Sequence, residues 1–174
     1  MSAMQEESKS LFHIVGVTVA ASQIFETVFV LGARLALKQA DIQVLEDIEP
    51  ISESRSFKQP AKALLNELSQ AQSIEPGLES RITKLIDERH RVIHRLFREF
   101  GWPAAMPPKK EAEFRSLCAW VTSESGAMSI VFTDLVLTWM KRFPATSPTA
   151  IEYEGNFKEL AADIRAQSEA ASAA

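Results

Sequence analysis

The feature that most restricts the fold is an apolar stretch from Leu11 to Leu37. It belongs to a predicted helix, from about Ser10 to Gln39, whose apolar residues cover most of its circumference. A helix that is apolar almost all round needs neighbours on most of its sides. The sequence therefore predicts that this helix lies at the centre of a bundle or in an interface between chains.

The same stretch is long enough to cross a membrane, but its polar residues argue against that. They include His13, Ser22, Gln23, Glu26 and Arg34. A charged residue near the middle of a membrane span costs about 2.5–3.5 kcal/mol. The first ten residues also lack the cationic start of a secretory signal. We therefore predict a cytoplasmic protein without membrane association, and the single Cys118 fits that reducing compartment.

Composition places the chain among soluble globular proteins. Its 174 residues suit one domain, with 46% hydrophobic and 24% charged residues. Six glycines are few for a turn-rich all-β fold, and one cysteine excludes a disulfide framework or a cysteine-rich metal site. Because the net charge is −4, any contact with nucleic acid needs a local basic patch.

Hydrophobic periodicity and the positions of the prolines divide the chain into helices. We expect them at about Ser10–Gln39, Gln59–Gln72, Pro76–Phe100, Lys110–Phe143 and Asn156–Gln167. Gly101 follows the third of these, as is typical of a helix end. The predicted architecture is all-α: an up-and-down helical bundle of four main helices plus a short C-terminal helix.

This architecture implies a division of the chain. Residues 1–9 are expected to be a disordered N-terminus, residues 10–143 the bundle, and residues 144–174 a C-terminal tail with the short helix. The first and fourth helices are too apolar for a lone bundle whose outer faces all meet water. A homodimer explains the surplus, because a second copy would bury it.

The third helix carries the chemical signal of the chain. Between Arg81 and Arg98, six basic residues stand against two acids, a local charge of +4 in a chain whose total is −4. A phosphate ligand uses this kind of patch. Two of the three histidines, His90 and His94, lie about one helical turn apart in the same segment.

Arg89 has an unusual position on this helix. At about 100° per residue it projects into the middle of the apolar face, while His90 and His94 lie on the border of that face. A buried guanidinium needs a partner. Glu26 and Asp134 are the candidates, and we predict Glu26, because it lies in a narrow polar strip on the first helix.

The pattern Arg89-His90-x-x-x-His94 resembles the signature of the HEPN superfamily of helical-bundle proteins. That signature is an Arg, a polar residue, a few further residues and then a His, all within one helix. Glu88 and the run from Leu96 to Glu99 resemble the flanks found in one subset of the family. The close resemblance covers about a dozen residues, and a long apolar first helix bearing a Glu matches more loosely.

The resemblance implies metal-independent cleavage of RNA without a cofactor. It implies that His94, with His90 beside it, transfers protons as the ribose 2′-OH attacks the adjacent phosphate. The products would be a 2′,3′-cyclic phosphate and a 5′-OH. It implies that Arg89, supported by Glu26, orients the histidine or stabilises charge on the phosphorane. An imidazole with an ordinary pKa near 6.5 and a guanidinium that binds phosphate through two hydrogen bonds suit these roles.

The resemblance also implies partners. Arg91, Arg95 and Arg98 are the expected contacts to the RNA backbone. A homodimer in which two motif helices form one cleft is implied as well, together with a toxin–antitoxin or phage-defence setting and an antitoxin-like partner. Arg89 and His94 point about 140° apart on a straight helix, so the two side chains of one copy would converge poorly on a substrate. In a dimer, the half-sites of two copies can form one cleft.

Two alternatives stay open at this point. The first is a non-catalytic interaction or dimerisation module, in which Arg89 and Glu26 form a structural pair and the flanking arginines are a solvated face. The second is a small metal-binding protein, because Asp87, His90 and His94 share one helical face and His at i and i+4 can chelate zinc. Flanking arginines repel a cation, so we expect no metal site.

Overall fold

The computed structural model describes the backbone of residues 3–38, 42–48, 60–71 and 74–173. The elements are α1 Ala3–Lys38, η2 Leu45–Ile48, α3 Ala61–Ala71, α4 Pro76–His94, α5 Leu96–Glu99, η4 Pro103–Ala105, α6 Pro108–Met140 and α7 Pro148–Ala173, where η marks a 3-10 helix. These ranges contain no strand, and the prediction of an all-α helical bundle is confirmed.

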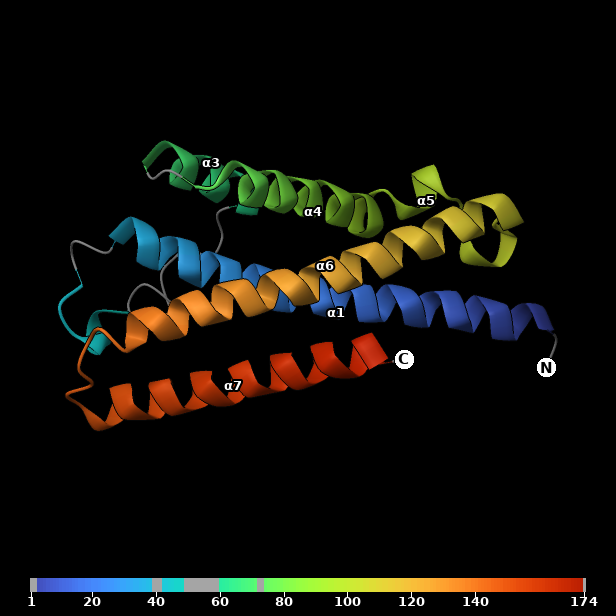
Figure 1. The fold of residues 1–174 in the computed structure, drawn as a ribbon. Helices are drawn as coiled ribbons and strands as arrows, with labels where there is room; N and C mark the ends of the chain where they lie inside the picture. Colours follow the sequence, from blue (N-terminus) through green and yellow to red (C-terminus); the bar gives the residue numbers. More distant parts are fainter. Residues whose placement is uncertain (1–2, 39–41, 49–59, 72–73, 174) are drawn as a thin grey trace.

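The helices form three layers (Figure 1). α1 and α6 lie side by side in the middle, α3 and α4 lie on one side of this pair, and α7 lies on the other. α1 and α6 run parallel, because Thr18 meets Thr122 and Gly32 meets Val136 farther along both helices. Successive helices alternate in direction from α3 to α7, whereas α1 and α3 run the same way, which a strict up-and-down order does not predict.

α1 is the central helix, as its composition predicts. Phe25 and Phe29 pack against Phe132 of α6, with ring centroids 6.4 Å and 5.0 Å away. A methyl group at Gly32 would lie 3.0 Å from the Phe132 ring, so glycine permits the close approach of the two helices there. By length and composition alone, Leu11–Lys38 could also cross a membrane, a test that core helices of soluble proteins pass as well.

A second hydrophobic cluster corrects our prediction for the C-terminal region. We expected residues 144–174 to be a tail with a helix only from Asn156 to Gln167, but α7 begins at Pro148 and continues to Ala173. Ala150 and Phe157 are buried against the ends of α1 and α6. The region is therefore a full helix of the bundle, and its many Ala and Glu residues favour helix.

Other boundaries differ from the prediction as well. α1 begins at Ala3, so part of the N-terminus that we expected to be disordered extends this helix. The third predicted helix breaks at Arg95, whose φ and ψ are −120° and 3°, and resumes as α5. α6 begins at Pro108 and ends at Met140. The expected boundaries at Gln39, Gln59 and Gln72 lie outside the described residues.

Candidate functional site

α4 carries the predicted site residues, and its sequence fixes where it begins and which face it buries. Pro76 opens the helix, and the Glu75 carboxylate accepts hydrogen bonds from the backbone N–H groups of Gly77 and Leu78. These bonds lower the pKa of Glu75. Ile82, Leu85 and Val92 form the buried face. The positions of the polar side chains follow from this orientation.

Arg89 lies in the same helical stripe as the buried residues of α4 and is anchored to α1. Its Nη2 donates to Oε2 of Glu26, and the two side chains are 20% and 35% exposed. The buried Nε of Arg89 has no hydrogen-bond partner among the residues that the structure describes. The prediction that Arg89 pairs with Glu26 is confirmed, and the other candidate, Asp134, pairs with Arg165 of α7.

The two histidines of α4 lie side by side on the surface. The ring centroids of His90 and His94 are 4.8 Å apart, and both residues are exposed. Within the described ranges, no hydrogen bond joins either imidazole to another residue, and none joins Arg89 to a histidine. The structure therefore brings the two histidines together and turns the guanidinium away from them, toward α1.

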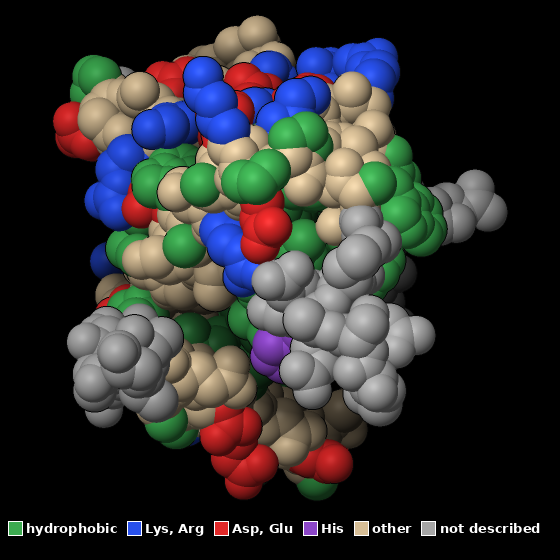
Figure 2. Space-filling view, turned by 90° about the vertical axis from the view of Figure 1, so that its right-hand side faces the viewer, with side chains coloured by type: hydrophobic (Ala, Val, Ile, Leu, Met, Phe, Trp, Pro, Cys, Tyr) green, Lys and Arg blue, Asp and Glu red, His purple; other side chains and the backbone are tan. Residues whose placement is uncertain are grey.

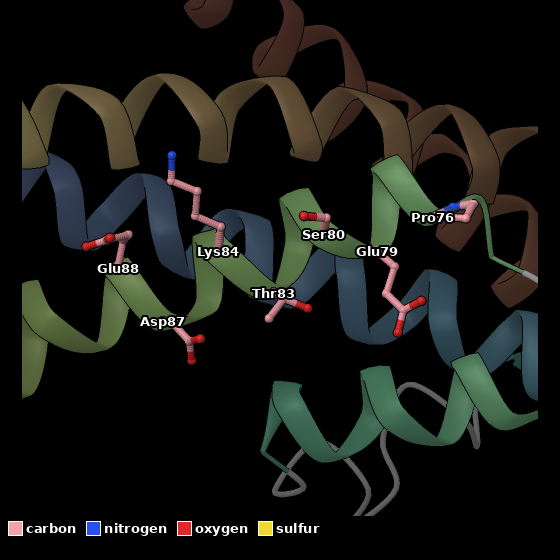
Figure 3. A pocket seen from close by; sticks show the side chains of 7 residues that line it. All are labelled: Pro76, Glu79, Ser80, Thr83, Lys84, Asp87 and Glu88. Atoms are coloured by element: carbon pink, nitrogen blue, oxygen red, sulfur yellow. The ribbon is translucent and has the colours of Figure 1, made fainter.

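The histidines are exposed because α3 covers only the first part of α4. Ser69, near the end of α3, bonds Glu79 at 2.8 Å, and Lys62, at its start, bonds Asp87 at 2.8 Å. The contact between the two helices therefore extends along α4 only as far as Asp87, and the C-terminal part of α4 lies beyond the start of α3. Figure 3 shows the covered part, where Glu79 and Asp87 lie toward α3 and Lys84 toward α6.

A hollow in this covered part is distinct from the candidate site. It has a volume of about 520 Å³ and is lined by Pro76, Glu79, Ser80, Thr83, Lys84, Asp87 and Glu88 (Figure 3). Three carboxylates surround a single lysine there, so the hollow disfavours a polyanion such as RNA. Neither Arg89 nor a histidine lines it. The chemistry predicted for α4 therefore belongs to its exposed C-terminal part.

The structure separates the three arginines that we expected to contact RNA. Arg91 donates to Glu99 at 2.8 Å and to Glu88 at 2.6 Å, and these hydrogen bonds raise its pKa, that to Glu99 most. Arg95 ends α4 and lies 4.0 Å from Glu99. Arg98 is exposed on α5 and has no ion pair with any described residue. Arg91 is thus engaged within the chain, while Arg98 is free to bind a ligand.

The metal-binding alternative required Asp87 beside both histidines. Asp87 instead bonds Lys62, which supplies a cation where the metal would lie. In the part of the chain that the structure describes, no three His, Cys, Asp or Glu side chains are grouped as metal ligands. His90 and His94 would therefore have to bind a metal without a third protein ligand from that part.

Sequence reasoning missed three exposed aromatic residues next to the histidines. Phe97 belongs to the stretch that we expected to be one continuous helix from Pro76 to Phe100, but the helix breaks at Arg95, and the Phe97 side chain is 56% exposed. Trp102 stacks on Phe97, with ring centroids 5.0 Å apart, and Phe12 of α1 meets Trp102 at 6.0 Å. No residue type marks the break in advance, because arginine favours helix.

Comparison with known protein families, curated proteins and solved structures finds no match for this chain. The functional argument therefore depends on the site itself. Two adjacent imidazoles can exchange protons with a bound ligand, and Arg98 can bind an anion. The pair of Arg89 and Glu26 fixes how α1 and α4 meet beside them.

Proposed function

We propose that this protein is a metal-independent endoribonuclease of the HEPN type. The observation that carries the proposal is the pair of exposed histidines, 4.8 Å apart, on the helix that also holds the anchored Arg89. The motif residues are therefore of two kinds: two imidazoles are open to a ligand, and one guanidinium is held by Glu26 of α1. This division suits proton transfer by the histidines and electrostatic support by the arginine.

In the proposed reaction His94 removes the proton from a ribose 2′-OH, and the 2′-oxygen attacks the adjacent phosphorus. The bond from phosphorus to the 5′-oxygen breaks, and His90, as imidazolium, gives that leaving oxygen its proton. The products are a 2′,3′-cyclic phosphate and a 5′-OH. Because the 2′-OH is the nucleophile and protons are the only species that the protein moves, His chemistry suffices.

We propose further that the active form is a homodimer. Arg89 faces α1 while the histidines face solvent, so one chain presents them on different sides of α4. A second copy can bring its own motif helix to the histidines. The exposed apolar side chain of Val17, 45% exposed, supports a partner for α1.

The biological setting is proposed from the HEPN resemblance alone. It is a cytoplasmic toxin–antitoxin or phage-defence role, in which RNA is the substrate. An antitoxin-like protein could act by covering the exposed histidines. The exposed Arg95 and Arg98 would hold the RNA backbone, with a smaller contribution from Arg91, whose charge two carboxylates already balance.

One observation favours a second candidate, a non-catalytic interaction or dimerisation module. The guanidinium of Arg89 already has a carboxylate partner in its own chain, as a purely structural pair would. In that case the exposed apolar residues of α1 would serve a protein contact only. The module predicts no chemical change in RNA, whatever the RNA sequence.

Cleavage by the purified protein in EDTA tests the proposal. Total RNA and a DNA oligonucleotide are incubated with it, and the product ends are mapped. We expect RNA to be cut to 2′,3′-cyclic phosphate and 5′-OH ends, and DNA to stay intact because it lacks the 2′-OH. Products with 3′-OH ends, or no cleavage of any RNA, would contradict the proposal, and the latter would favour the interaction module.

A further inference from the structure

The exposed aromatic residues of the described part of the chain form one cluster, here called the aromatic platform (Phe12, Phe97 and Trp102). Their side chains are 44%, 56% and 57% exposed. The rings of Phe97 and Trp102 are nearly parallel, at 18°, while Phe12 meets Trp102 edge-on at 69°. Aromatic side chains are usually buried, so three exposed together indicate a surface for a ligand.

The backbone holds the platform in place. Gly101 has a φ of 92°, a conformation that favours glycine, and it turns the chain back so that Trp102 lies on Phe97. Phe100 and Met106, just before and after this turn, are buried in the main core. The stacked rings are therefore presented on an anchored turn, which lowers the entropy lost when a ligand binds.

The surroundings of the platform are basic. Residues 89–110 carry six Lys or Arg side chains and a single acid, Glu99. Arg89 is paired with Glu26, Arg91 is bonded to Glu99, and Arg95 lies 4.0 Å from Glu99. Arg98 and the two lysines are therefore the cations without a carboxylate partner among the described residues. Lys110 donates to the Glu99 backbone carbonyl at 2.7 Å, and Lys109 has no ion pair with a described residue. Figure 2 shows this end of the molecule, where Lys and Arg side chains lie over the upper part with Asp and Glu among them and hydrophobic side chains below.

Aromatic faces surrounded by cations match the chemistry of single-stranded nucleic acid. Unpaired bases stack on exposed rings, and the phosphates between them bind the cations. Bases in a duplex are paired and stacked on one another, so they offer no free face. A purely apolar protein partner would gain nothing from the unpaired cations. Charge complementarity therefore favours a single strand over the other occupants.

We propose that the aromatic platform binds unpaired bases of single-stranded RNA and so selects the substrate class. This inference rests on the proposed ribonuclease function and adds a binding site to it. Phe97 follows His94 by three residues, so a base on the platform places neighbouring nucleotides beside the histidines. RNA would then be cut near an unpaired segment and not within a helix.

Binding of a fluorescent 2′-O-methyl oligouridine tests the platform, because this single strand lacks the nucleophile and stays intact. We expect Trp102→Ala to weaken binding about 5- to 160-fold, the range that one stacked base supplies. Phe97→Ala should also weaken binding of the oligonucleotide. It provides a second, independent test if Trp102→Ala folds poorly. Ile151→Ala, which removes another exposed apolar side chain, 60% exposed on α7, is the matched control and should bind like wild type.

The outcomes separate the platform from the catalytic proposal. Wild-type binding in both platform variants would overturn the platform, whether or not RNA is cleaved. Trp102-dependent binding without any cleavage of RNA would keep the platform and remove the ribonuclease. If Trp102→Ala turned a dimer into a monomer, as measured by sedimentation, and left oligonucleotide binding unchanged, the cluster would be an interface between copies and the proposal would be wrong.

Discussion

The two ends of the bundle use their polar side chains in opposite ways. At the closed end, where η2 meets the connection from α6 to α7, Glu46 accepts hydrogen bonds from the backbone N–H and the hydroxyl of Thr146. Asp47 likewise accepts two backbone N–H groups, those of Gln43 and Val44. Each of these carboxylates is engaged in holding the chain together.

The histidine end, formed by the C-terminal part of α4, α5 and η4, is different. His90, His94 and Arg98 are exposed and make no hydrogen bond or ion pair with any residue of the described ranges. We infer that these groups, which have no partner within the described ranges, are kept for an external ligand.

The largest effect on stability that we predict concerns Glu26, at the boundary between structure and site. Glu26→Ala leaves Arg89 without its carboxylate. A fully buried pair would lose about 3–5 kcal/mol, and because these side chains are 20% and 35% exposed we expect about 1–3 kcal/mol. Urea denaturation measures the loss. Glu159→Ala, at an exposed position of α7, is the matched control and should stay within about 0.5 kcal/mol of wild type.

Exchanging the charges of Glu26 and Arg89 distinguishes a structural role of this pair from a role of Arg89 in RNA cleavage. Glu26→Arg combined with Arg89→Glu restores opposite charges between α1 and α4, and should recover part of the stability that Glu26→Ala loses. RNA cleavage should stay below the wild-type rate, because a carboxylate replaces the guanidinium on α4. Full recovery of both stability and cleavage would show that Arg89 acts only as a structural partner.

The smallest predicted effect belongs to the closed end and depends on pH. Hydrogen bonds, chiefly from the Thr146 side chain, lower the pKa of Glu46 from 4.5 to about 2. Since the folded pKa is below the unfolded one, the contribution is complete above about pH 4.5 and is lost as pH falls toward about 2. Glu46→Gln should therefore show a shallower decline in unfolding free energy across this window, with unchanged RNA cleavage at neutral pH. An identical decline in wild type and Glu46→Gln would show that the hydrogen bonds from Thr146 to the Glu46 carboxylate do not contribute to stability.

Much of the architecture could be predicted, because long helices leave a periodic pattern. The apolar circumference of α1 indicated a central helix, and the isolated Arg89 within an apolar face required an acidic partner on another helix. Glu26 is that partner. Both inferences depend on the cost of leaving a charge or an apolar face without a partner, and that cost can be read from sequence.

The rest depended on contacts that sequence does not reveal. Whether His90 and His94 are covered depends on where α3 begins relative to α4, which is set by packing between the two helices. The break at Arg95, which exposes Phe97, occurs at a residue that favours helix. α7 is longer than predicted because residues outside Asn156–Gln167 show little apolar periodicity, although many of them favour helix.

We infer that the fold keeps His94 for an external ligand. The most direct test of this inference is the rate of RNA cleavage by His94→Ala relative to wild type, in EDTA and with saturating protein. His13→Ala is the matched control, because it removes an exposed histidine of α1 instead. We predict that His94→Ala lowers the rate about 100-fold or more, as expected for loss of a general acid or base, while its thermal unfolding stays that of wild type. An unchanged cleavage rate in His94→Ala, or unfolding of this variant, would contradict the claim that the fold keeps His94 for an external ligand.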